Sequence, residues 1–111
     1  VAPNVASFVG TGTIREHVVG LADGRPTPAQ MDAMRDLVRR EMEAGALGIG
    51  SSLIYAPDAF NTPEDLVELA RVAARYRGKY ITHMRSEGDR LLEGVDETIR
   101  VSCEAGGPAQ I

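Results

Sequence analysis

Lys79-Tyr80-Ile81-Thr82-His83-Met84-Arg85-Ser86-Glu87-Gly88-Asp89 is the stretch that decides the fold of this 111-residue chain. Its first four residues are β-prone, Gly88 marks a turn, and apolar residues at helical spacing follow. This pattern predicts a strand over 79–82, a loop with ionisable side chains, and then a helix. Residues just past the carboxyl ends of parallel strands line the active face of an α/β protein, so His83 is a candidate metal ligand or general base. A lone histidine at a strand end is also typical of a hydrogen-bonded structural residue, since a zinc site needs three or four ligands.

Short β-prone runs alternate with helical patterns along the whole chain. The runs lie at 5–9, 47–49, 79–82 and 108–111. This order is typical of a parallel sheet with right-handed crossovers, and it fits either an open doubly wound sheet or an arc of a (β/α)8 barrel. The pair Gly10-Thr11-Gly12 would favour the open sheet as part of a dinucleotide-binding loop. We expect no helix directly after these glycines and at most a short helix within 14–21. The evidence for a nucleotide-binding loop is therefore weak.

Three amphipathic helices are predicted between these runs. Thr27 and Pro28 are typical of an N-cap and first helical position, and Gln30 completes a capping box. Thr62 and Pro63 repeat this arrangement. Gly45, Gly78 and Gly106 are the expected helix ends. The residues predicted to face the core are Met31, Met34, Leu37, Val38 and Met42, then Leu66, Leu69, Ala70, Ala73 and Tyr76, then Leu91, Leu92, Val95, Ile99 and Ser102 or Cys103.

The composition narrows the classes of function. A net charge of -4 without a cluster of Lys and Arg argues against a nucleic-acid surface. Cys103 is the single cysteine, expected to be a buried or half-buried thiol, so the chain has no intrachain disulfide and nothing indicates an oxidising compartment. Without a run of ~20 apolar residues or a signal peptide, we expect a soluble, cytoplasmic protein with no membrane partner. Because Val1 is not a methionine and Ile111 lies within a predicted strand, we expect both ends to be cut.

Four separated segments carry a likeness to a known family. They are Asn4–Gly10 with Gly12–Arg15, Met42–Gly48, Leu53–Pro57 and, above all, Tyr80–Glu87 with its Tyr-Ile-Thr-His-Met-Arg-Ser-Glu sequence. In this order they resemble the D-aminoacylases, which are N-acyl-D-amino-acid deacylases of the amidohydrolase superfamily. The resemblance extends over nearly the whole chain.

The resemblance implies an α/β fold that is a partial (β/α)8 TIM-type barrel, with about three βα units plus one strand. Residues 1–111 would then be a fragment of a single catalytic barrel domain, and the chain's partner would be the remainder of its own barrel. The activity implied is zinc-dependent hydrolysis of N-acyl-D-amino acids to a D-amino acid and a carboxylate.

The resemblance also assigns roles to individual residues. It makes His83 a metal ligand and Tyr55 a contact to the amino-acid part of the substrate. Arg85 is expected to contact substrate or, with Glu87, to order the loop. The family's other metal ligands and its general-base aspartate match nothing in this chain, so no catalytic residue lies within it and the isolated chain is expected to be inactive.

Two other interpretations and two departures from the family pattern stay open. The chain could be an inert fragment or an interaction module whose edge strands need a partner, or part of a hydantoinase-like cyclic amidase. Thr11 stands where the family usually has histidine, and Gly50-Ser51-Ser52-Leu53 where it usually has Ser-Ser-Gly-Leu. If the backbone at Ser52 kept a left-handed conformation, the change would cost about 1 kcal/mol or more.

Overall fold

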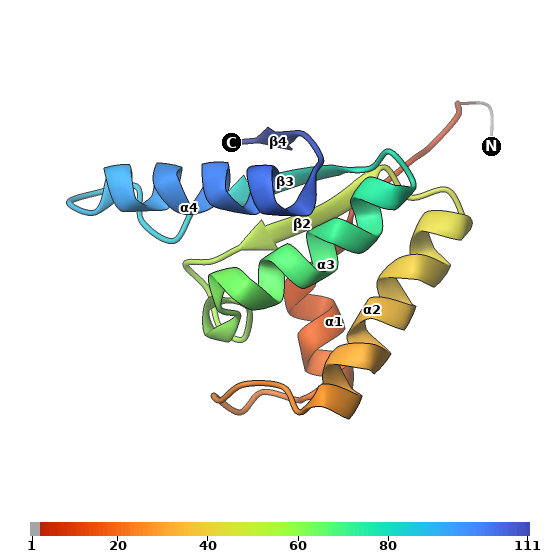
Figure 1. Cartoon of the computed structure of the whole chain (residues 1–111), viewed down its shortest axis with the longest axis horizontal. Coiled ribbons are helices and arrows are strands. Elements are labelled where there is room, and N and C mark those ends of the chain that lie inside the picture. Colours follow the sequence, from red (N-terminus) through yellow and green to blue (C-terminus); the bar gives the residue numbers. More distant parts are fainter. Residues whose placement is uncertain (1–2) are drawn as a thin grey trace.

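The computed structural model describes residues 3–111, whose four strands form one parallel sheet in the order β1-β2-β3-β4. Figure 1 labels β2, β3 and β4 of this sheet together with the four α-helices. The strands are β1 (Val9–Gly10), β2 (Gly48–Ser52), β3 (Lys79–His83) and β4 (Ala109–Gln110). The helices are α1 (Thr11–Val18), α2 (Pro28–Glu43), α3 (Pro63–Arg75) and α4 (Leu91–Ala105), with a 3-10 helix η1 (Asp58–Phe60) before α3. The predicted alternation of strands and helices is confirmed. No helix within the described range is long and apolar enough to cross a membrane.

The helices cover only one face of the sheet. Each helix contacts the next one along the chain, so that α1 to α4 form a single layer. Ile49, Ser51, Tyr80 and Thr82 are buried against this layer, whereas Ile81 faces a groove on the other side. A doubly wound sheet has helices on both faces, and a barrel has them only outside. The one-sided cover therefore identifies an arc of a barrel.

Both predicted threonine caps are confirmed. Thr27 Oγ1 accepts a hydrogen bond from Gln30 N at 3.2 Å, and Gln30 Oε1 accepts one from Thr27 N at 2.8 Å. Thr62 and Asp65 make the same reciprocal pair at 3.2 and 3.0 Å. Gly45 follows the end of α2 with φ +105°, the left-handed conformation expected of it.

We expect Thr62→Ala to lower the free energy of unfolding by about 1 kcal/mol, because the N–H of the buried Asp65 loses its acceptor. Thr62→Ser keeps the hydroxyl and serves as the control, with a change within about 0.5 kcal/mol. Urea unfolding followed by circular dichroism measures both. Equal stabilities of the alanine variant and the unaltered protein would show that this cap contributes nothing.

The predicted core faces of α2 and α3 are largely correct. Met31, Met34, Val38 and Met42 are buried in α2, and Leu66, Leu69, Ala70 and Ala73 in α3. Tyr76 is an exception, since it lies past the end of α3 and is 39% exposed. The left-handed turn after α3 is made by Arg77 (φ +61°), not by Gly78. Gly78 instead packs tightly, because a Cβ there would lie 2.6 Å from Cε of Met42.

The predicted core face of α4 is wrong. Leu91, Leu92 and Ile99 are exposed, and Cys103 is an exposed thiol rather than a buried one. The buried residues of α4 are instead Gly94, Thr98, Val101 and Ala105. Packing against α3 requires small side chains on this face. Within residues 3–111, α4 is the last helix of the layer, and its most apolar stripe has no helix against it.

The start of the chain also differs from the prediction. Val5 is 80% exposed, and β1 begins only at Val9. Helix α1 then starts at Thr11, directly after the strand, where no immediate helix was expected. The reason is tertiary, since Thr11 donates a hydrogen bond from Oγ1 to the carboxylate of Asp58 at 2.6 Å. That carboxylate lies at the amino end of α1, where the helix dipole favours a negative charge.

Candidate active site

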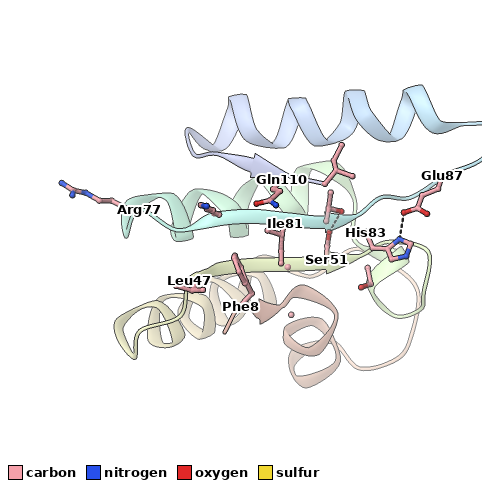
Figure 2. A pocket seen from close by; sticks show the side chains of 14 residues that line it. Phe8, Leu47, Ser51, Arg77, Ile81, His83, Glu87 and Gln110 are labelled. Atoms are coloured by element: carbon pink, nitrogen blue, oxygen red, sulfur yellow. Dashed lines mark hydrogen bonds and ion pairs between the residues drawn. The ribbon is translucent and has the colours of Figure 1, made fainter. Parts of the chain in front are cut away.

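His83 is the last residue of β3, and its ring lies at the carboxyl rim of the sheet (Figure 2). Side chains alternate along a strand, so His83 shares its face with Ile81 while Tyr80 and Thr82 face the helices. It is in register with Ser52, the last residue of β2. The imidazole side chain is 43% exposed and borders a groove of about 960 Å³ on the open face of the sheet. His83 is thus accessible from the inside of the barrel arc.

Glu87 lies beside this imidazole. Its Oε1 lies 3.1 Å from Nδ1 of His83, and Figure 2 shows the pair at the end of the groove. A carboxylate beside Nδ1 favours the tautomer of the neutral ring that carries its proton on that nitrogen. With Nδ1 beside the carboxylate, Nε2 is the nitrogen that remains for a metal ion.

The structure fits one ligand of a metal site but not a whole site. Among residues 3–111, no group of three His, Cys, Asp or Glu side chains could hold a metal ion. Cys103 lies on α4 and does not border the groove. Imidazole is nevertheless a preferred zinc ligand, and His83 reaches the groove from the strand-end rim. His83 therefore fits one ligand position of a zinc site, and the described residues supply no others.

Tyr55 lies beside His83. The two ring centroids are 6.1 Å apart with an interplanar angle of 78°, so the tyrosine ring meets the imidazole edge-on. Tyr55 is 62% exposed, and it belongs to the loop between β2 and η1. This loop is tied to the rim because the N–H of Leu53 donates to the carbonyl of His83 at 3.0 Å. The substrate contact itself stays a prediction.

Arg85 is engaged by the protein. Its Nε and Nη2 donate to the Glu97 carboxylate on α4 at 2.9 and 2.8 Å, which raises the pKa of Arg85. Its Nη1 donates to the carbonyl of Ala59, and Nη2 also to that of Asn61, both at 2.7 Å. Four hydrogen bonds use most of the five N–H donors of a guanidinium. The geometry favours the loop-ordering alternative for Arg85, and a direct substrate contact stays a prediction.

Sequence reasoning missed a buried polar cluster, the α1–η1 cluster, which consists of Thr11, Arg15, Asp58 and Asn61. Asp58 accepts hydrogen bonds from Thr11 Oγ1 and from Asn61 Nδ2 at 2.6 and 2.8 Å. Arg15 donates from Nη1 to Asn61 Oδ1 at 3.2 Å, and its guanidinium lies over the Phe60 ring. The four residues are spread over 11–61, so no local spacing could have revealed them.

The two departures from the family pattern are accommodated. Among residues 3–111, Arg77 is the only non-glycine residue with a positive φ, so Ser52 carries no left-handed strain and the expected penalty is absent. Thr11 is fully buried and donates to Asp58. It therefore has a structural role in this chain.

The comparisons with known proteins agree with this geometry. No family model matches the chain. It is 36% identical over 110 residues to a D-aminoacylase of Alcaligenes xylosoxydans xylosoxydans, covering 99% of this chain and 23% of that protein. It is 33% identical to an N-acyl-D-glutamate deacylase of the same organism, covering 93% of this chain and 21% of that protein. The chain thus spans less than a quarter of the length of these relatives.

Two solved structures extend the likeness to three dimensions. An N-acyl-D-glutamate deacylase from Bordetella bronchiseptica, complexed with zinc and a phosphonate mimic of the tetrahedral intermediate, superposes with a TM-score of 0.93 at 33% identity. A D-aminoacylase that defines a novel subset of amidohydrolases gives a TM-score of 0.92 at 32% identity. Each match covers 97% of this chain and 23% of the other.

A parallel arc covered by helices on one side, with an imidazole at its carboxyl rim, is a segment of an amidohydrolase-type (β/α)8 barrel. Within that class, the chain is homologous to one segment of the D-aminoacylase family of N-acyl-D-amino-acid deacylases. The resemblance seen in the sequence is confirmed.

Proposed function

We propose that this chain supplies one metal ligand and one wall of the substrate pocket to a zinc-dependent hydrolase of N-acyl-D-amino acids. The products would be a D-amino acid and a carboxylate. The observation that carries the proposal is His83, which is open to the groove at a strand end and flanked by Tyr55, in a chain homologous to D-aminoacylases. A cytoplasmic location and the remainder of the barrel as partner belong to the same proposal.

The described residues have defined tasks in this mechanism. Zinc, when bound, would polarise the amide carbonyl and lower the pKa of a bound water toward about 7. His83 would bind it through Nε2 as a neutral imidazole, with the proton on Nδ1 beside the Glu87 carboxylate. The hydroxyl of Tyr55 would contact the amino-acid part of the substrate. Arg85 would hold the loop before α3 in place through the carbonyls of Ala59 and Asn61.

The test uses the intact protein that carries this chain. We expect about one or two zinc ions per molecule by elemental analysis, and hydrolysis of N-acetyl-D-amino acids but not of their L-enantiomers. Hydantoins are the control substrates for the cyclic-amidase alternative. The proposal would be contradicted if the intact protein folds but contains no zinc when purified and hydrolyses none of these amides after zinc is added.

The isolated 111-residue chain tests the alternative that this chain is by itself an inert fragment or an interaction module. We expect it to bind zinc weakly and to hydrolyse nothing, because the described residues offer no three-donor site. A tight zinc site in this chain alone would contradict the assignment of His83 as a shared ligand.

A further inference from the structure

We propose that Asp58 is a positioning residue that holds Tyr55 beside His83, and that it acts through the α1–η1 cluster. What Tyr55 does to the substrate rests on the proposed function. Its placement by Asp58 does not, because that follows from the contacts of the loop alone. The proposal adds a determinant of substrate binding that lies behind the loop and does not touch the substrate.

The carboxylate of Asp58 joins three parts of the fold. Its side chain is buried, with 6% of the residue exposed. Oδ1 accepts from Thr11 at the start of α1 and from Asn61 at the end of η1, and Oδ2 accepts from the N–H of Ser52 at 2.5 Å. Loss of this buried carboxylate is costly, because the N–H of Ser52 and the amide of Asn61 would lose their acceptor away from water, whereas the Thr11 hydroxyl also lies 3.2 Å from the carbonyl of Gly50. Asp58 therefore fixes the end of β2 relative to α1 and η1.

These bonds close the loop that carries Tyr55. Ser52 and Asp58 are six residues apart, and the bond between them pins both ends of the segment 53–57. Inside it, the N–H of Tyr55 donates to the carbonyl of Ser52 at 3.0 Å, and the carbonyl of Tyr55 accepts from Ala59 at 2.8 Å. The exposed tyrosine ring has little packing of its own. Its position beside His83 consequently depends on the anchored ends.

A second anchor holds the far side of the same loop. Arg85 donates to the carbonyls of Ala59 and Asn61, and Glu97 on α4 holds Arg85 in turn. On the near side α1 fits closely, since a Cβ on Gly12 would lie 3.0 Å from Cβ of Asp58. With the far side held by Arg85, loss of the Asp58 contacts should release the segment around Tyr55 rather than unfold the sheet.

A double-mutant cycle in the intact protein separates positioning from general destabilisation. We expect Asp58→Ala to raise KM for N-acetyl-D-amino acids about tenfold with zinc content unchanged. In a Tyr55→Ala background the same change should raise KM less than about twofold, because the residue it positions is gone. Asp96→Ala, which removes an exposed aspartate of α4, is the matched control and should leave KM unchanged. An equal factor in both backgrounds, or no effect in either, would overturn the proposal.

Fluorine NMR of protein labelled with 3-fluorotyrosine tests the placement without any assay. The Tyr55 resonance is identified by its loss in Tyr55→Phe. In Asp58→Ala it should shift and narrow while the resonance of Tyr76, whose hydroxyl donates to Glu43 of α2 at 2.9 Å, stays in place. An unmoved Tyr55 signal would contradict the proposal even in an inactive protein, whereas absent hydrolysis with a moved signal would refute only the proposed function. If Asp58→Ala does not fold, Thr11→Val serves for the same test, because it removes one of the three donors to Asp58. We then expect a smaller shift of the Tyr55 resonance.

Discussion

Replacing His83 with alanine should remove most of the bound zinc from the intact protein and lower kcat/KM by at least about 100-fold, or about 2.7 kcal/mol of transition-state stabilisation. The imidazole occupies the strand-end rim and is open to the groove, and the described residues contain no second histidine or cysteine there to replace it. A zinc site that loses one of its few protein ligands binds the metal weakly and no longer holds the attacking water in place. Zinc stoichiometry by elemental analysis and kcat/KM for N-acetyl-D-amino acids measure the two effects.

His17→Ala is the matched control for this experiment. His17 is the other histidine of the chain, lies exposed on α1 and does not border the groove, so zinc content and turnover should not change. Glu87→Gln should give an intermediate loss of about 10-fold, because the ring loses the carboxylate that orients it while keeping its metal-binding nitrogen. Unchanged zinc content and turnover in His83→Ala would remove His83 from the metal shell.

Gly48→Ala should destabilise the protein by about 3 kcal/mol or more, the largest stability loss expected from adding a single methyl group. Gly48 has φ +151° and lies opposite Lys79 in the β2–β3 pair. A Cβ there would lie 1.9 Å from the carbonyl oxygen of Lys79 and 2.6 Å from its nitrogen. Since both atoms belong to the backbone, the two central strands would have to separate. Urea unfolding measures the loss.

Gly88→Ala is the control for Gly48→Ala. Gly88 lies in the loop after β3, its φ is not in the left-handed region, and a Cβ there would meet no atom within 4 Å. We expect the free energy of unfolding of the Gly88→Ala variant to differ from that of the unaltered protein by no more than about 0.5 kcal/mol. Equal unfolding midpoints for the two alanine variants would mean that the backbones of β2 and β3 are not in the close contact described.

The sequence predictions were correct for features made by residues close together in the chain, and less accurate for features made by residues far apart. The threonine caps at 27 and 62 were predicted correctly, because a capping box is made by residues three apart. β2 was predicted over 47–49 but runs to Ser52, because its last residues pair with Thr82 and His83 of β3. The core face of α4 was predicted from its most apolar stripe. The structure instead buries Thr98 and Val101, because α3 is the neighbour that α4 packs against.

By itself, the sequence determined the alternation of strands and helices, their capped starts and the place of His83 at the end of a strand, because periodicity and capping depend on near neighbours in the chain. Only the tertiary structure decided that all helices lie on one face, that Tyr55 meets the imidazole edge-on and that Asp58 binds Thr11, 47 residues away. The physical reason is that such contacts depend on how whole elements pack and on which buried polar groups find partners, and neither is set by local spacing.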